Sequence, residues 1–488
     1  MRLIDRNFIW LVLGLGMILP GCSGTTVDLD TPAHSQMLVE DRDKAGQGFA
    51  EQGQTIKLSL DDAIKRGFEK NLDARVAAYE ALSAQDSVTI AQLQALPGVN
   101  LSGGYVGRSN PGASSSRSVE TGQESLEPSM STEQHRRVAS LEANWNLLDA
   151  ALALADAAKA DEEAKIASEH YMKVVQNVER DIYTAYWRAL AYQDIRDQSK
   201  LLMDNAARQI ENIDNAASKK LLSSNEAGEK MAMLADRQRT LRDLHDRLQL
   251  AEIELKSMLS LPLDSKLILT TKRRDIESDV RRMLGENVTN QEWAALQSRP
   301  EMREEILRKN MTVRDTRREV MQTFPGINLL ASNEYDSNKF LVDPSWSNFS
   351  AKIAQSITGI LTLPKRYEAA KNKEAITDAR RQALSSAILA QVHIARARLD
   401  ATNDVSKSTR LSQKAAGRKS TALAGKRAQG MASGQDALLA QIESDIEKIR
   451  AGLAYAELQD AYAAMNTTLG RSITGTPVQQ LAMAGGKR

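Results

Sequence analysis

The chain has 488 residues, of which 42% are apolar, 4% aromatic and 26% charged, and its formal net charge is +1. So few aromatic residues among so many charges are typical of long helices packed through small side chains rather than of a conventional globular core. The near-zero net charge argues against a nucleic-acid-binding protein, because basic doublets are scattered among acids instead of forming a phosphate track.

The N-terminus has the pattern of an export signal. A weakly basic start is followed by an apolar run over residues 8–19 and then by Leu-Pro-Gly-Cys ending at Cys22. This resembles a bacterial lipoprotein signal, which implies that residues 1–21 are removed and that Cys22 is acylated. A buried cysteine or an ordinary signal is the alternative. Ser23 favours the outer over the inner membrane, and the polar residues 22–55 are expected to form a tether.

The first structural repeat is expected over residues 56–262. A helical pattern runs to Leu96 and is stopped by Pro97-Gly98, where proline ends the helix and glycine frees a turn. Alternation of apolar and polar residues then predicts strands at about 99–107 and 137–147, separated by a long polar loop.

A helical hairpin is expected over residues 149–260. No proline or glycine occurs between Asp149 and Ser218, which predicts one uninterrupted helix of about 100 Å at 1.5 Å per residue. Heptad-like spacing of leucines in the return helix predicts a coiled coil. The hairpin tip is expected at residues 221–226.

The plan then repeats after a connecting segment at 263–288. Pro325-Gly326 follows Pro97-Gly98 at an offset of 228, and a second match at the same offset indicates internal duplication. The second repeat is expected over 289–470, with strands at about 327–335 and 347–357 and a helical hairpin at 364–470. Residues 471–488 are expected to be a flexible tail.

The four strands have the length that a tilted membrane strand needs. No apolar run of eighteen residues follows the signal, so a transmembrane helix is not expected in the mature chain. Four strands cannot close a barrel, so the chain must oligomerise if the strands cross a membrane. Aromatic residues lie near the strand ends, where membrane interfaces would be: Tyr105, Trp145, Tyr335 and Trp346. An ordinary soluble sheet is the alternative.

This order of elements resembles the TolC-type outer-membrane efflux proteins. The resemblance covers about residues 56–472 and is carried by 59–64, Leu-Pro-Gly at 96–98, Trp-Asn-Leu-Leu-Asp at 145–149, Phe-Pro-Gly at 324–326, and 430–439. It implies a mainly α-helical protein with a β-barrel: a homotrimer whose strands form one twelve-stranded barrel, continued by a periplasmic helical tunnel. A periplasmic adaptor and an inner-membrane pump would dock at the hairpin tips.

The second-repeat tip carries the family's spacing of Gly430 and Asp436, with Ser433 between them. The resemblance implies adaptor docking there and makes Asp436 a candidate gate residue, the alternative being an exposed tip acid. The first-repeat tip lacks both the glycine and the aspartate, which puts a familiar latch at that hairpin in doubt.

No enzyme is expected. The five histidines show no metal-ligand spacing, and no nucleophile or phosphate-binding motif occurs, so no cofactor or metal is predicted. The expected function is a passive exit duct in the outer membrane of a Gram-negative bacterium, anchored to membrane lipid through Cys22. The alternatives are a structural periplasmic coiled-coil lipoprotein without a pore, and a duct for secreted protein or polysaccharide. A third possibility, the adaptor itself, would need a lipoyl-like β domain, which the sequence does not show.

Overall fold

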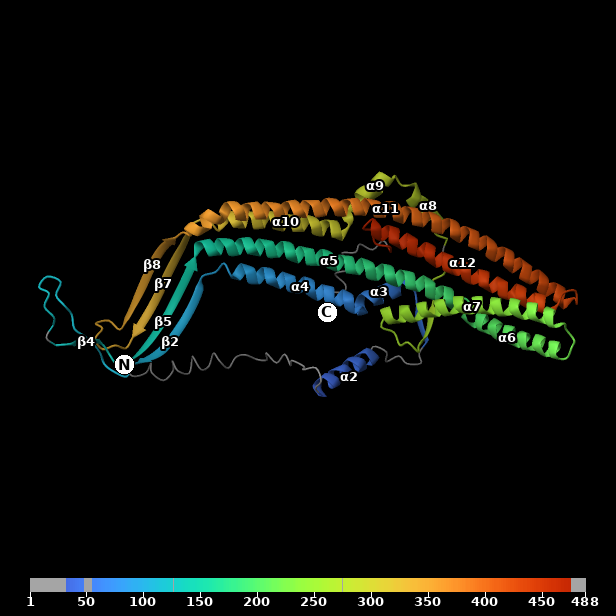
Figure 1. The fold of residues 1–488 in the computed structure, drawn as a ribbon, viewed down its shortest axis with the longest axis horizontal. Helices are drawn as coiled ribbons and strands as arrows, with labels where there is room; N and C mark the ends of the chain where they lie inside the picture. Colours follow the sequence, from blue (N-terminus) through green and yellow to red (C-terminus); the bar gives the residue numbers. More distant parts are fainter. Residues whose placement is uncertain (1–31, 48–54, 126, 274, 475–488) are drawn as a thin grey trace. The chain divides into compact units, whose positions relative to one another are not determined.

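The computed structural model describes residues 32–47, 55–125, 127–273 and 275–474 (Figure 1). By their contacts the residues group into two units, 1–56 with 260–267 and 57–259 with 268–488. The expected signal peptide and Cys22 lie outside the described residues. In the first unit, helix α2 (Pro32–Gln47) occupies much of the segment expected to be a tether. Strands β1 (Thr55–Leu58) and β6 (Lys266–Leu269) form a two-stranded sheet.

The second unit contains the duplicated elements. Helices α3 (Leu60–Lys70) and α4 (Leu72–Leu93) precede the first strand pair, and helices α9 (Val288–Ser298) and α10 (Pro300–Met321) precede the second. Asn71 begins α4 by accepting a hydrogen bond from the Ala74 amide (2.9 Å), and α10 begins with Pro300 at its first position.

The main sheet is antiparallel, with strands in the order β2-β5-β7-β8. These are β2 (Gly98–Gly107), β5 (His135–Asn146), β7 (Gly326–Asp336) and β8 (Ser345–Ala354). The long loop after β2 contains two further short strands, β3 (Gly112–Ser114) and β4 (Ser129–Thr132), which pair with each other. Each main strand has ten to twelve residues.

The tips of two helical hairpins lie at the end of this unit that is opposite the main sheet (Figure 1). The first comprises α6 (Arg196–Ser218) and α7 (Ser224–Met258), reached through α5 (Leu147–Gln193). The second comprises α11 (Ile357–Ala428) and α12 (Gly434–Thr468). Helix α8 (Glu277–Gly285) lies in the expected connecting segment.

The apolar core follows the hairpins rather than the sheet. Leu234, Leu241, Leu248 and Leu255 recur every seven residues along α7, and each is at most 1% exposed. Leu234, Leu241 and Leu248 pack in one cluster with residues of α6 and α12, including Leu202, Ile442 and Ile446. A second cluster joins α8 to α12. Heptad spacing of this kind is what holds a coiled coil together.

Three expectations from the sequence are wrong in detail. The expected helix from Asp149 to Ser218 breaks at Asp194 and Ile195, so that α5 and α6 are separate. The second hairpin begins at Ile357 and not at 364, because Ser356 caps α11 by accepting a hydrogen bond from the Gly359 amide (3.1 Å), and Pro364 lies inside the helix.

The start of the expected flexible tail is also fixed. The buried Glu179 carboxylate accepts hydrogen bonds from the Ser472 hydroxyl (2.9 Å), the Ile473 amide (3.1 Å) and the Thr474 amide (3.1 Å). A buried carboxylate needs such donors, so residues 472–474 are tied to α5.

Candidate functional site

The sheet has one apolar and one polar face. In an antiparallel pair, residues opposite each other in register share a face. The register places Leu101 opposite Leu141, Trp145 opposite Leu329, and Ala331 opposite Phe349. On this face Leu101, Phe349 and Ile353 are 64%, 84% and 71% exposed. The face therefore presents apolar side chains that nothing in the chain covers among the described residues.

The opposite face is held by polar contacts. The Ser102 and Ser140 hydroxyls lie 2.8 Å apart, the Asn348 amide donates to Glu334 (2.8 Å), and Arg136 pairs with Asp336. Alternation of an apolar and a polar face is typical of strands between lipid and water.

Both edges of the sheet are open within the described residues, since β2 and β8 each pair on one side. An open edge exposes a row of backbone donors and acceptors, which is not tolerated in lipid. A sheet of this kind in a membrane must therefore pair with another chain.

The predicted aromatic residues divide between the two faces. Tyr105, Trp145 and Tyr335 lie on the apolar face, where Tyr105 stacks on His135 with 5.8 Å between ring centroids. Trp346 is opposite Glu334 and shares the polar face, because it differs from Phe349 by an odd number of positions. Trp346 therefore does not share a face of the sheet with the other three aromatic residues.

The helix–strand junctions are built alike in the two repeats. Pro97 and Pro325 each immediately precede a strand that begins at Gly98 or Gly326. Neither glycine has a left-handed backbone, so the expected freeing of a turn by glycine is wrong, and the turn is completed before the proline.

A side chain from the strand end closes each junction. The Trp145 indole Nε1 donates to the Ala95 carbonyl (3.0 Å), and the Gln355 amide donates to the Thr323 carbonyl (3.2 Å). Trp145 and Gln355 are equivalent at an offset of 210, and the carbonyls are equivalent at 228. Because one position has tryptophan and the other glutamine, the sequence does not indicate that Gln355 is the counterpart of Trp145.

The hairpin tips also match, although their sequences differ. In the second tip Gly430 has a φ of 73°, and in the first Lys220 has a φ of 57° at the position 210 residues earlier. The Leu221 amide donates to the Ala216 carbonyl (2.9 Å), as the Met431 amide does to the Lys426 carbonyl (2.8 Å). The first tip therefore makes the same turn without the family glycine.

A serine caps the helix that follows each tip, with an acid three residues later. The Ser433 hydroxyl accepts a hydrogen bond from the Asp436 amide (3.0 Å) and donates one to the Asp436 carboxylate (2.8 Å). Ser223 accepts equivalently from the Glu226 amide (3.2 Å). The shared pattern of serine and an acid three residues later was the signal by which the first tip could have been recognised.

A ladder of ion pairs joins the two repeats. Helices α5 and α10 run antiparallel, and within the described residues they are bridged by five pairs: Asp156–Arg318 (2.7 Å), Lys159–Asp315 (3.2 Å), Glu162–Arg314 (2.9 Å), Glu169–Arg303 (2.9 Å) and Lys173–Glu301 (3.5 Å). Burial raises the pKa of the Glu169 carboxyl, against the opposing charge of Arg303. This seam is polar, unlike the leucine-lined hairpins.

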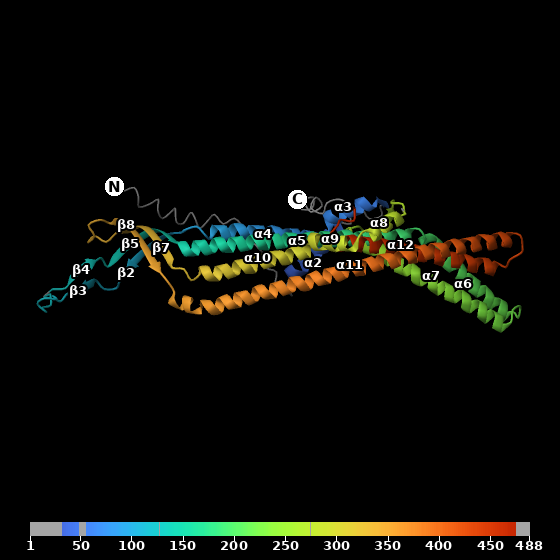
Figure 2. The same ribbon diagram turned by 90° about the horizontal axis from the view of Figure 1, so that it is seen from above.

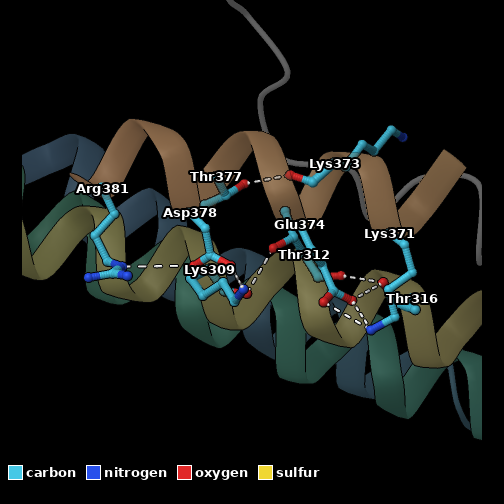
Figure 3. A network of polar contacts seen from close by, with 9 residues as sticks. All are labelled: Lys309, Thr312, Thr316, Lys371, Lys373, Glu374, Thr377, Asp378 and Arg381. Carbon is cyan, nitrogen blue, oxygen red and sulfur yellow. Dashed lines mark hydrogen bonds and ion pairs between the residues drawn. The ribbon is translucent and has the colours of Figure 1, made fainter. Parts of the chain in front are cut away.

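The seam between α10 and α11 is polar as well (Figure 3). Lys309 pairs with Asp378 and lowers the pKa of that carboxyl. The Thr316 hydroxyl donates to Glu374, whose pKa is lowered by this bond and by Lys371. These contacts hold α10 between α5 and α11.

A cavity of about 500 Å³ opens between α5, α10 and α11. Six of its charged lining residues form the ion pairs Asp156–Arg318, Lys159–Asp315 and Glu319–Arg366, and Lys373 adds one more positive charge. No group of three or more acidic, histidine or cysteine side chains within the described ranges is arranged to hold a metal ion. None of the helices in the described part of the chain is long and apolar enough to span a membrane.

No protein-family model matches the sequence, and no curated protein matches it significantly. Solved structures do match. The CmeC outer membrane channel of Campylobacter jejuni has a TM-score of 0.65 at 12% identity, over 88% of this chain and 89% of that one. The outer membrane protein VceC of Vibrio cholerae has 0.62 at 14%, over 85% and 96%. The open MtrE outer membrane channel of Neisseria gonorrhoeae has 0.60 at 15%, over 85% and 89%. The chain therefore has the fold of these outer-membrane channels, as its resemblance to TolC-type proteins implied.

Proposed function

We propose that the chain is the subunit of a passive exit duct in the outer membrane. The observation that carries this proposal is the main sheet, which exposes one apolar face and two unpaired edges while its strands continue into long helices. Such a sheet is suited to a membrane only when several copies close it. The likeness of the fold to outer-membrane channels supports the same assignment.

The proposed assembly is a homotrimer. Three copies of four strands would give a twelve-stranded barrel, with the polar face inward and the helices continuing as a periplasmic tunnel. Acylated Cys22 would add a lipid anchor in the outer membrane of a Gram-negative bacterium. We also propose the boundaries expected from the sequence: residues 1–21 for the signal, 22–55 for the tether, and 56–262 and 289–470 for the two repeats.

The proposed partners are a periplasmic adaptor and an inner-membrane pump. The two tips share their backbone turn and capping serine, so both are proposed to contact the adaptor, although only the second has the family glycine. The duct itself would perform no chemistry, and the pump would supply the energy to export its cargo. A polypeptide or polysaccharide cargo is the alternative to small toxic compounds.

Conductance tests the duct directly. The purified full chain should migrate as a trimer that dissociates on heating, and it should form ion-conducting pores in planar lipid bilayers. A protein that stays monomeric and never conducts would favour the pore-free coiled-coil lipoprotein instead.

The proposed gate role of Asp436 can be separated from its contact with the capping Ser433. Ser433→Ala removes the cap itself, and Asp436→Ala removes a first-turn acid that accepts from Ser433, so each should weaken the start of α12 by up to about 1 kcal/mol. If Asp436 also forms an acidic ring in the pore, only Asp436→Ala should reduce block of the conductance by divalent cations. Equal cation block in the two variants would leave Asp436 as an exposed acid that only supports the capping Ser433.

A further inference from the structure

The break between α5 and α6 is bound by groups from other parts of the chain. Ile195 lies in the break at the N-cap position of α6 and makes no side-chain capping bond. The Asp194 carbonyl accepts a hydrogen bond from Lys448 Nζ of α12 (3.2 Å), and the Asp194 carboxylate pairs with Arg273 (2.9 Å). A helix of the second repeat therefore donates a hydrogen bond to the backbone of the break.

A buried acid lies one helical turn from Lys448. Asp445 is 2% exposed, and its Oδ1 accepts a hydrogen bond from Gln198 Nε2 of α6 (2.7 Å). Its Oδ2 has no hydrogen-bond partner among the described residues. An ionised carboxylate with so few donors is costly to bury, whereas a protonated one is not. Asp445 thus joins α12 to the start of the first hairpin at the cost of a buried charge.

The neighbouring charged groups are mostly paired. Lys448 is the charged residue on the same helix that favours an ionised Asp445. Other groups on α5, α6, α7 and α12 make the following contacts: Asp194 with Arg273, Arg196 with Glu252 and Asp197, Arg237 with Glu443, and His245 edge-on to Tyr192. The charges of Asp246 and Lys200 act on His245 in opposite directions. Gln198, the direct partner, is neutral, so proton exchange at Asp445 is not compensated by its immediate neighbour.

Proton binding at these groups has opposite effects on stability. Burial raises the pKa of Asp445 from 3.8 to about 6, although Lys448 opposes it. The free-energy cost of burying the ionised Asp445 carboxylate is absent below about pH 3.8 and complete above about pH 6. Acidification through this window therefore stabilises the packing of α12 against α6. Burial lowers the pKa of His245. The stability that the buried neutral imidazole contributes is therefore lost as the pH falls below the usual histidine pKa of 6.5.

We propose that Asp445 is a proton-operated latch between the two hairpins. Proton uptake fastens α12 to the start of α6, and proton release loosens this contact so that α6 and α7 move about the break at Asp194 and Ile195. Figure 2 shows the hairpin of α6 and α7 separating from that of α11 and α12 toward their tips. The latch concerns contacts within one chain, so it does not depend on the proposed duct.

Hydrogen exchange of the full chain tests the latch. Protection of amides in residues 195–202, corrected for intrinsic exchange rates, is compared at about pH 7.5 and about pH 5. Protection should rise about tenfold on acidification, below a ceiling of about a hundredfold that the raised pKa sets. Asp445→Asn, which resembles the protonated acid, should be highly protected at both pH values.

Two further variants separate a latch from a merely structural bond. Gln198→Ala removes the donor to the ionised form, so the pH midpoint of protection should move upward from about 6. Asp214→Asn changes an exposed acid of α6 and should leave the pH dependence of protection as it is in the unaltered chain. The latch is contradicted if protection of the unaltered chain fails to rise on acidification. It is also contradicted if Asp445→Asn keeps the pH dependence or loses protection at both pH values.

Discussion

Phe349→Arg is expected to reduce assembly of the proposed trimer by about tenfold or more. Phe349 lies in the middle of β8 on the apolar face and is 84% exposed. An arginine facing lipid near the midplane of a barrel costs about 2–4 kcal/mol, and the proposed trimer would contain it three times. The heat-modifiable trimer in the membrane fraction should fall by about tenfold or more, as measured by unheated gel electrophoresis, because each 1.4 kcal/mol is a factor of about ten.

The adjacent residue supplies a matched control. Ser350 lies on the polar face, opposite Leu330, so Ser350→Arg should point toward water and leave trimer yield nearly unchanged. The face of the sheet on which the arginine lies would then alone decide whether the trimer yield falls. Equal yields of the two variants, whether high or low, would contradict an apolar face in contact with lipid.

Gly470→Ala is expected to destabilise the chain by about 2–5 kcal/mol. Gly470 ends α12 with a φ of 69°, and a left-handed backbone costs a residue with a side chain about 1–2 kcal/mol. A Cβ there would also lie 2.8 Å from the backbone carbonyl carbon of Ser298, at the end of α9. Forcing the two helix ends apart adds about 1–3 kcal/mol. The urea midpoint of unfolding of the solubilised protein should fall accordingly.

Gly285→Ala is the control for this variant. Gly285 ends α8 without a left-handed backbone, and a Cβ there would meet nothing within 4 Å. Alanine should therefore be neutral or stabilise the helix by up to about 1 kcal/mol. An unchanged midpoint for Gly470→Ala would mean that α9 moves aside freely and that the close approach has no structural role.

Residue periodicity predicted the features that depend on local pattern. The alternation around Leu141 and Phe349 gave the two faces of the sheet, and the leucine spacing of α7 gave the hairpin core. These signals are strong because burial of one face selects a period of two in strands and of about three and a half in coiled coils. Trp346 was predicted to be a membrane-interface residue because it lies near a strand end. The alternation along the same strand places it on the polar face instead.

The remaining features depend on contacts distant in sequence. The residues around Asp194 include no proline or glycine, and the groups that bind the break come from Lys448 and Arg273. Lys220 adopts a left-handed backbone without a residue type that would indicate it. Similarly, Glu179 fixes the segment after α12 by bonds that only the folded chain brings together. Single-sequence patterns do not encode such partners.

The even number of strands in the main sheet has a consequence for assembly. Successive strands of the order β2-β5-β7-β8 alternate in direction, so the two edge strands run oppositely. When identical copies are placed in a ring, β8 of one copy meets β2 of the next in the antiparallel sense, and every seam repeats the pairing found inside the chain. An odd number would force a parallel seam in each copy. Strand direction is thus compatible with a ring of any size, so it does not by itself select the three copies that we propose.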